Sequence, residues 1–237
     1  MRIADVVEGS APLLLLADHA GVAVPDDVAL GVSEADMGRH IASDLGTDAL
    51  TRALARRLGA GAVLARISRL VVDLNRARDN RAVIPLESDG TAIPGNRLDA
   101  AGREERLARW HDGYHRLVAG RIAENRPELI VSVHSFTPRL AGGAPRPWDL
   151  GVLYNRDERS GRAMLDALAD TGLVVGDQQP YPGTVFNATL DRHGEAAGIP
   201  SVLVEVRQDH LATPAGVESM ADTLAAAIRR VHEGTRS

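Results

Sequence analysis

Apolar runs of strand length alternate along this chain with longer segments whose apolar residues recur at helical spacing. The apolar runs occupy residues 12–17, 129–133, 152–154 and 201–206, with two further strand-like pieces, AVLAR and RLVVDL, between residue 62 and residue 74. The helical segments occupy residues 33–58, 102–125, 160–171 and 213–232. Continuous apolar runs are typical of strands that helices cover on both faces. The sequence therefore predicts an α/β fold with a mixed, mostly parallel sheet flanked by helices.

Composition excludes several classes of protein. The length suits one domain, which we expect to span residues 1–237. The chain has no cysteine, and all 27 basic residues are arginine, which excludes disulfides, thiolate metal sites and a lysine Schiff base. The net charge of −5 argues against a nucleic-acid partner. No apolar run approaches the roughly 20 residues of a membrane helix, and no signal peptide is visible, so we expect a cytoplasmic protein.

Polar residues stand at the ends of the apolar runs, where ligands bind in open α/β sheets. These residues are Asp18-His19, Asn75-Arg76, His134-Ser135 and Glu205. Two histidines, a carboxylate and an arginine could build a metal-dependent hydrolase site. Each also has a structural interpretation, for example a hydrogen-bonded histidine or an ion pair between Asp73 and Arg76. Glu205 favours catalysis most, because an unpartnered buried carboxylate is costly.

Other histidines have weaker support. His111 and His115 lie four residues apart on a predicted helix, which is a metal-ligand spacing and also a common surface pattern. His193 falls in a predicted loop before the last strand, from which it could reach the site. A serine hydrolase or a dinucleotide-binding protein has less support, because no G-x-S-x-G elbow occurs and DHAGVAVP, without a G-x-G-x-x-G motif, follows the first strand.

Several segments together resemble one known family. ADHAGVAVP, HIASDLGTDAL, ISRLVVDLNRARDN, SVHSFTP, GVLYNRD, DQQPYPG, DRHGEAAGIP and VEVRQDHL occur in this order. They are similar to the N-formylglutamate amidohydrolases over roughly residues 13–211, and the strongest segments are SRLVVDLNR, HSFTP and EVRQD. The resemblance implies a three-layer α/β sandwich similar to the zinc carboxypeptidases. It also implies hydrolysis of an amide by water at a metal.

The resemblance also implies roles for single residues. His19 and His134 match metal ligands, Asn75 and Arg76 match the pair that holds a substrate carboxylate, and Glu205 matches the glutamate that acts on the water. The carboxypeptidase pattern has a glutamate three residues after the first histidine, and this chain has Val22 there. The third ligand must then come from elsewhere. Asp44 is the first candidate, because HIASDLG belongs to the family pattern, and Asp18 is the second. An ordinary helix carboxylate is an equal interpretation of Asp44.

These observations predict a metal-dependent amidohydrolase for an N-acyl acidic amino acid, with zinc as the metal and N-formyl-L-glutamate as the leading substrate. Arg69 is expected to stabilise the oxyanion or bind a second carboxylate, and Tyr181 and His193 are expected to contact substrate. Further candidates for the second carboxylate are Arg78, Arg81, Arg139 and Arg146. Two alternatives stay open: a hydrolase for another N-acyl amino acid, and a non-catalytic carboxylate-binding relative that lost its metal.

Overall fold

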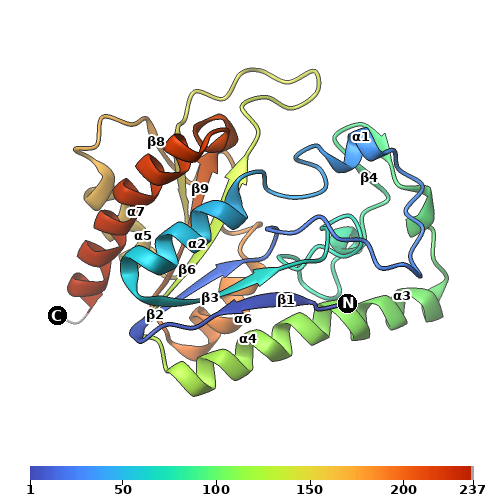
Figure 1. Cartoon of the computed structure of the whole chain (residues 1–237), viewed down its shortest axis with the longest axis horizontal. Helices are drawn as coiled ribbons and strands as arrows, with labels where there is room; N and C mark the ends of the chain where they lie inside the picture. The colour runs from blue at the N-terminus through green and yellow to red at the C-terminus, as the bar shows by residue number, and fades with distance from the viewer. Residues whose placement is uncertain (236–237) are drawn as a thin grey trace.

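A seven-stranded sheet forms the centre of the computed structural model, which describes residues 1–235 (Figure 1). Its strands, in spatial order, are β1 Ala4–Val7, β3 Ala60–Ala65, β2 Ala11–Ala17, β6 Leu129–Phe136, β9 Ser201–Arg207, β7 Leu150–Leu153 and β8 Val175–Asp177. The pairs β1–β3 and β7–β9 are antiparallel, and the other four neighbouring pairs are parallel. The predicted mixed, mostly parallel sheet is confirmed.

Helices cover both faces of the sheet. One face carries α2 Thr47–Leu58, α5 Glu158–Leu168 and α7 Pro214–Thr235. The other carries α3 Ala100–Arg106, a π-helical turn Leu107–His111, α4 Asp112–Asn125 and α6 Ala188–His193. The α3–α4 segment runs as one long helix along the bottom of Figure 1, as residues 102–125 predicted. Shorter elements are α1 Glu34–Met37, the hairpin β4 Glu87–Ser88 and β5 Thr91–Ala92, and 3₁₀ turns at Arg81–Val83, Pro94–Asn96, Glu195–Ala197 and Gln208–Leu211.

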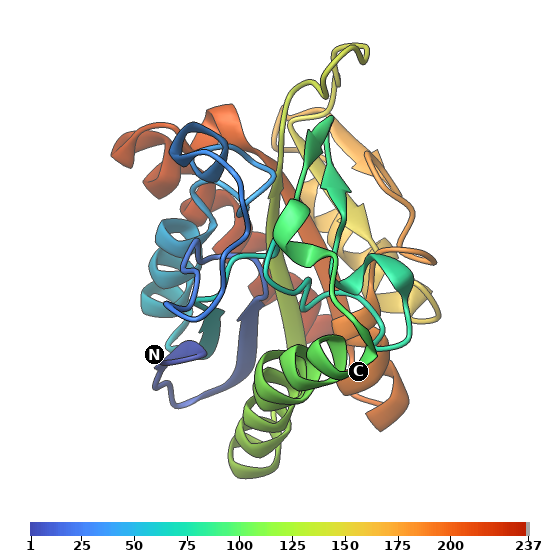
Figure 2. The same ribbon diagram turned by 90° about the vertical axis from the view of Figure 1, so that its right-hand side faces the viewer.

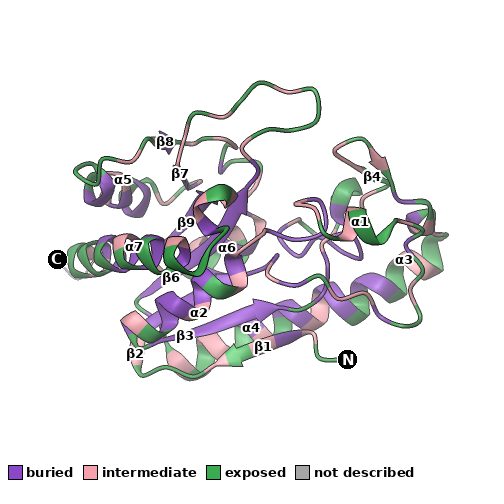
Figure 3. Ribbon diagram, turned by 45° about the horizontal axis from the view of Figure 1, so that its top comes forward, coloured by how far each residue is buried: buried purple, intermediate pink, exposed green. Residues whose placement is uncertain are grey.

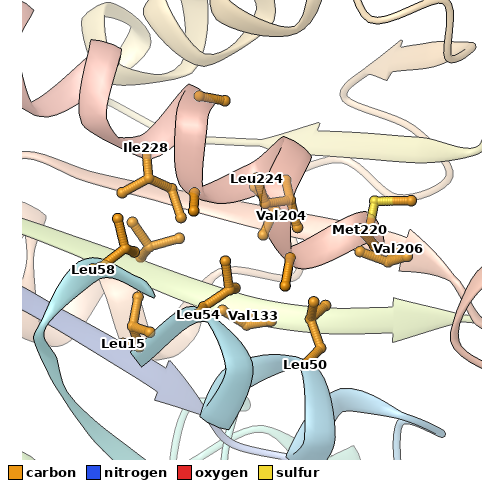
Figure 4. Close-up of a cluster of buried hydrophobic side chains, with 14 of the residues drawn as sticks. Leu15, Leu50, Leu54, Leu58, Val133, Val204, Val206, Met220, Leu224 and Ile228 are labelled. Carbon is orange, nitrogen blue, oxygen red and sulfur yellow. The ribbon is translucent and has the colours of Figure 1, made fainter. Parts of the chain in front are cut away.

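The alternation of side chains along each strand creates two cores. In β2, Leu13 and Leu15 pack toward α2 and α7, whereas Leu14 and Leu16 pack toward the long helix α3–α4. Figure 4 shows the first core, where leucines of α2 meet the inner residues of α7 across the ends of β6 and β9. In Figure 3 the strands are buried along most of their length, and the exposed residues lie on the outer surfaces of the helices. Burial on both faces explains why these strands are continuously apolar.

The segment 33–58 was expected to form one helix, and that expectation is wrong. Helix α1 ends after one turn, and residues 38–46 run irregularly before α2 begins. Gly46 has a φ of +83°, and a Cβ at this residue would lie 2.4 Å from the Cβ of Leu211. A left-handed glycine therefore breaks the helix between the two parts. As a result Asp44 lies in a loop, with its backbone N–H bonded to the carbonyl oxygen of His19.

The strand predicted for RLVVDL is also absent from the structure. Its residues are buried, but they form successive turns that begin at Ser68. The Ser68 hydroxyl donates to the carbonyl oxygen of Ala42 and accepts from the backbone N–H of Leu70. Such local side-chain hydrogen bonds compete with strand pairing. The turns carry Asp73 to Arg76 back across the end of the sheet.

Residues 75–96 and 138–148 are rich in glycine and proline, and they form two long connections of different structure. Residues 75–96 contain the β4–β5 hairpin, whereas residues 138–148 are irregular and project beyond the end of β6 (Figure 2). The backbone N–H of Ala141 donates to Oδ1 of Asp89 over 3.0 Å, which joins the two loops. Within residues 1–235, none of the helices has both the length and the apolar character needed to cross a bilayer.

Candidate active site

The candidate site lies where the central parallel strands end. His19 follows β2, His134 lies in β6, and Glu205 lies in β9 directly opposite His134 in the strand register. A cavity of about 270 Å³ is lined by all three side chains. This volume is slightly below the roughly 300–1,000 Å³ of sites that hold drug-sized ligands. The cavity therefore suits a small molecule.

His19, Asp44 and His134 form a compact cluster of potential metal ligands at the base of the cavity. One ligand atom of each residue lies within 4.8 Å of the others. Nδ1 of His134 is 2.8 Å from Oδ2 of Asp44, and Nδ1 of His19 is 3.5 Å from the same oxygen. Nδ1 of His19 has no hydrogen-bond partner among the described residues. The three side chains thus direct two nitrogens and one oxygen to a common point.

The second nitrogen of each histidine faces a carboxylate. Nε2 of His19 is 2.7 Å from Oδ1 of Asp73. Nε2 of His134 is 3.1 Å from the Ser132 hydroxyl oxygen and 3.7 Å from Oδ2 of Asp18. Metal-binding histidines commonly have such a carboxylate partner, which fixes the ring orientation and the tautomer.

Electrostatic interactions in the cluster favour charged side chains despite complete burial. Burial by itself lowers the pKa of His134, but the nearby carboxylates of Asp18 and Asp44 raise it to about 10. Burial opposes ionisation of Asp44, yet the nearby His19 and the hydrogen bond from His134 hold its pKa well below the usual range. Hydrogen bonding and charge from His134 likewise lower the pKa of Asp18 to about 2, against the effect of burial. Opposite charges at short range outweigh desolvation here.

Glu205 is the exception among the carboxyl groups of this cavity. Burial raises its pKa to about 7, although the charges of His134 and Arg69 oppose the shift. The residue is 7% exposed, and its Oε2 atom has no hydrogen-bond partner in residues 1–235. A carboxyl group with a pKa near neutrality can both accept and release a proton at physiological pH. Glu205 is therefore a buried carboxyl group that can exchange a proton near neutral pH.

Arg69 connects two carboxylates behind the cluster. Its Nη1 donates to Oδ1 of Asp44 and its Nη2 to Oδ2 of Asp73, each over 3.0 Å. Burial opposes the charge of Arg69, but Asp73 and Asp44 raise its pKa above the usual range. The side chain lines the cavity, yet its guanidinium is already held by two ion pairs.

Asn75 and Arg76 both line the cavity, as their place after a predicted strand suggested. The Asn75 amide is engaged within the protein, since it donates to the carbonyl oxygen of Phe186 and accepts from the backbone N–H of Thr189. The guanidinium of Arg76 stacks 4.5 Å from the centre of the Phe186 ring, and its Nε is 3.6 Å from Oδ2 of Asp73. Arg76 is thus more available to a ligand than Asn75 is.

Tyr181 forms part of the cavity wall, where its ring lies 5.2 Å from that of Phe186. Burial raises the pKa of its phenol. His40 and Asp89 line another part of the wall, and Nε2 of His40 is 3.3 Å from Oδ2 of Asp89. Asp89 belongs to the β4–β5 turn, which no pattern in the sequence connected with the site.

His193 lies outside this cavity, and the expectation that it sits in a loop is wrong. It is the last residue of α6, and its Nε2 is 2.9 Å from Nδ1 of His115. We call His111, His115 and His193 the histidine cluster. Nε2 of His111 bonds to the carbonyl oxygen of Arg76, and Nε2 of His115 bonds to that of Leu74. These contacts hold the backbone on both sides of Asn75 rather than a metal.

Val22 does not line the cavity and is 51% exposed. Asp44 supplies the third potential ligand from a different part of the chain. Sequence reasoning did not identify Asp73 as a partner of His19. Its position two residues before Asn75, within SRLVVDLNR, was the available signal.

The residues present fit a divalent metal such as zinc. Two imidazole nitrogens and one carboxylate oxygen are a donor set that zinc accepts, with a fourth position left for water or substrate. The unpartnered Nδ1 of His19 faces the oxygen of Asp44 that also lies nearest to His134. No reorganisation of the strands is needed to bring these three atoms together.

Comparisons with known proteins concern the fold and the family of the chain. A search of functionally characterised proteins found no match. The structure of a gene product from Agrobacterium tumefaciens superposes with a TM-score of 0.94 at 29% identity, and the match covers 100% of this chain and 97% of the other. An N-formylglutamate amidohydrolase from Ralstonia eutropha JMP134 shares the fold with a TM-score of 0.78 at 18% identity, over 100% of this chain and 99% of the other.

The model of one protein family, described as N-formylglutamate amidohydrolase, matches residues 11–212. This range confirms the resemblance found in the sequence and contains every residue of the cluster of potential metal ligands. The chain therefore belongs to the N-formylglutamate amidohydrolase family and is a hydrolase that acts on an amide bond.

Proposed function

We propose that this chain hydrolyses the amide bond of N-acyl amino acids with the help of a divalent metal. The leading metal is zinc, and the leading substrate is N-formyl-L-glutamate, which would yield L-glutamate and formate. One observation carries the proposal. The atoms of His19, Asp44 and His134 converge within 4.8 Å of one another, and Glu205, with a pKa of about 7, lies directly across the strand pair from His134.

His19, Asp44 and His134 would hold the metal, which would supply polarisation of the acyl carbonyl and a lower pKa for water. Glu205 would accept a proton from the attacking water and pass it to the nitrogen of the leaving amine. Its raised pKa suits both transfers, because a base with a pKa near the working pH can also act as an acid. Asp73 and Asp18 would hold the rings of His19 and His134 in orientation.

Arg69 is placed to favour negative charge that develops on the acyl oxygen. It lines the cavity while Asp44 and Asp73 fix its guanidinium in place. A preorganised cation needs no rearrangement when charge appears in the transition state. Because its charge is already shared between two carboxylates, we assign Arg69 to this role rather than to binding a substrate carboxylate.

Arg76 would bind the α-carboxylate of the substrate. Its guanidinium faces the cavity and has one distant carboxylate contact, at 3.6 Å. A planar guanidinium matches a carboxylate with two parallel hydrogen bonds. Asn75 would act through Arg76, because its engaged amide fixes the backbone to Phe186, on which Arg76 stacks. Tyr181 would form the wall beside the acyl amino acid.

The test compares metal-stripped protein with the same protein after addition of Zn²⁺. Each sample receives the N-formyl derivatives of glutamate, glutamine, aspartate and alanine, and the released amine is measured. We expect amine release from formylglutamate only in the metal-loaded sample. Release from the other derivatives but not from formylglutamate would overturn the leading substrate, and no release from any of them in either sample would overturn the activity.

A further inference from the structure

A substrate with a second carboxylate needs a second cation, because the cavity wall already contains the acidic groups of Asp89 and Glu205. Five arginines were candidates for this cation on their positions in the sequence. The structure excludes Arg69, which Asp44 and Asp73 hold, and Arg78, which pairs with Asp112 and Glu104 beside the histidine cluster.

The guanidinium groups of two more candidates, Arg81 and Arg139, make no hydrogen bond, ion pair or cation–π contact with a residue that lines this cavity, within residues 1–235. Arg81 lines a separate cavity with Ile84 and Leu86. The exposed side chain of Arg139 donates from Nε to the carbonyl oxygen of Gly143 over 2.6 Å, within its own loop. Arg146 is the remaining candidate.

Arg146 lies against residues that line the candidate active site. Its guanidinium carbon is 4.8 Å from the centre of the Tyr181 ring and 5.8 Å from that of Phe136. Its Nη1 donates to the carbonyl oxygen of Thr137 over 3.1 Å. Tyr181, Phe136 and Thr137 all line the cavity. Burial lowers the pKa of His40 on the same wall, and the charge of Arg146 adds to this effect. The guanidinium therefore stands at the edge of the cavity.

The charge of Arg146 is not neutralised within the protein. Among residues 1–235, no carboxylate lies within ion-pairing distance of it, in contrast to Arg69 and Arg76. Stacking on aromatic faces leaves the edge of the guanidinium, with its N–H donors, available to a ligand. An unpaired cation beside a cavity that already contains a carboxylate-binding arginine is well suited to a dianionic ligand.

The backbone around Arg146 fixes its position. The N–H of Arg146 donates to the carbonyl oxygen of Pro138 over 2.9 Å, which closes the base of the loop 138–148. The tip of the loop is attached to the β4–β5 turn through Ala141 and Asp89. Figure 2 shows this loop and the hairpin rising on the same side of the sheet. A loop held at both base and tip can present a side chain in a defined direction, as specificity requires.

We infer that Arg146 binds the side-chain carboxylate of the substrate and thereby selects N-acyl derivatives of acidic amino acids. The inference rests on the proposed function, in which Arg76 binds the α-carboxylate. Arg146 and Arg76 would then hold the two ends of a dicarboxylate while the amide lies over His19, His134 and Glu205.

The experiment compares N-formyl-L-glutamate with N-formyl-L-glutamine, which has nearly the same shape but no side-chain charge. A charge-assisted hydrogen bond contributes roughly 10- to 150-fold in kcat/KM. We expect the metal-loaded wild-type enzyme to prefer formylglutamate by about this factor. In Arg146→Gln the preference should disappear, mainly through a higher KM for formylglutamate, with a much smaller change for formylglutamine. Arg139→Gln, in the same loop, should keep the wild-type preference.

The outcomes separate this inference from the proposed function. If the wild-type enzyme hydrolyses both substrates equally well, or if Arg146→Gln keeps the preference for formylglutamate, the role of Arg146 is overturned while the amidohydrolase activity stands. If neither substrate is hydrolysed, the proposed function itself fails. Loss of hydrolysis of both substrates to the same extent in Arg146→Gln would also contradict a role in selecting the side chain.

Discussion

The protein contains two groups of buried histidines whose surroundings differ. One is the pair His19 and His134, and the other is the histidine cluster. His19 and His134 have carboxylates at both ring nitrogens, from Asp18, Asp44 and Asp73. In the cluster, Nε2 of His111 and Nε2 of His115 bond to backbone carbonyl oxygens, and His115 also bonds to His193. The one carboxylate beside these described rings is that of Asp112, 3.4 Å from Nδ1 of His111.

The pKa values follow the partners rather than the burial. Burial lowers the pKa of His115 to about 3 and that of His193 to about 4, whereas the carboxylates raise that of His134 to about 10 in spite of burial. Histidines with carboxylate partners are prepared for a cation, while histidines with neutral partners stay neutral and hold a loop. Spacing along the chain therefore does not distinguish the two groups of histidines, whereas their acidic neighbours do.

The largest expected effect separates the two groups by metal content. His19→Ala and His134→Ala should each lose zinc and amidohydrolase activity, because each removes one of three ligands. His111→Gln and His115→Gln should retain about as much zinc as the wild-type protein. Metal analysis of the purified variants measures this directly. Full zinc content in both alanine variants, or loss of zinc in both glutamine variants, would contradict the assignment.

The second effect concerns Glu205, a buried carboxyl group of the site whose Oε2 has no hydrogen-bond partner among the described residues. Glu205→Gln keeps the size of the side chain but cannot accept a proton, so kcat should fall on the order of 10²- to 10⁴-fold. Zinc content should be unchanged. Asp191→Asn is a matched control, because burial also raises the pKa of Asp191 but its carboxylate binds Asn155 and Asn187 outside the candidate site.

Steady-state kinetics with formylglutamate, together with the melting temperature of each variant, decide the role of Glu205. A near-normal kcat in Glu205→Gln would remove this residue from the proton transfers. A lower melting temperature with little kinetic change would instead indicate a structural carboxyl group.

The sequence could predict those residues of the site that lie in continuous strands or just after them. His19, His134 and Glu205 stand in or directly after β2, β6 and β9, and a buried strand is recognisable from an unbroken apolar run. Residues in turns were harder to place. Asp44 was expected on a helix because apolar residues recur at helical spacing across residues 33–58. That periodicity does not show that Gly46 adopts a left-handed conformation against Leu211.

Contacts between distant segments could not be predicted in this way. His115 and His193 are 78 residues apart, and their hydrogen bond depends on how α6 packs beside α4. The choice of Arg146 among five arginines depends in the same way on tertiary contacts, since Arg69 and Arg78 pair with carboxylates and Arg81 lines another cavity. Such pairings are set by tertiary packing, which neither local propensity nor spacing encodes.

A smaller effect should follow from changing only the partner of a site histidine. Asp18→Asn replaces the carboxylate near Nε2 of His134 with an amide, which should weaken zinc affinity roughly 10- to 100-fold. Tyr114→Phe is the companion variant, because Tyr114 donates to the other oxygen of Asp18 over 2.5 Å and does not contact the candidate ligands. Its effect on zinc affinity should be smaller. Competition with a chelator of known affinity gives both values, and an unchanged affinity in Asp18→Asn would show that this carboxylate does not support His134.

The smallest effect tests His115 and His193 of the histidine cluster through the pH dependence of stability. In the unfolded chain His115 and His193 titrate near the ordinary value of 6.5, whereas in the folded chain their pKa values are about 3 and about 4, first because of burial. As pH falls below about 6.5, the unfolded chain binds protons that the folded chain does not. The free energy of unfolding should therefore decrease between pH 7.5 and 5, by about 1–2 kcal/mol for each histidine.

His115→Gln isolates this contribution, because it removes one of the two titrating groups and leaves every other ionisable group in place. Urea unfolding of the wild-type protein and the variant, in the same metal state at pH 7.5 and at pH 5, gives the two differences. The variant should lose less stability than the wild type as pH falls, because one of the groups that bind a proton only in the unfolded chain has been removed. Equal losses in the two proteins would mean that the folded protein accepts a proton at His115, so that neutral partners alone would not account for the contrast with His134.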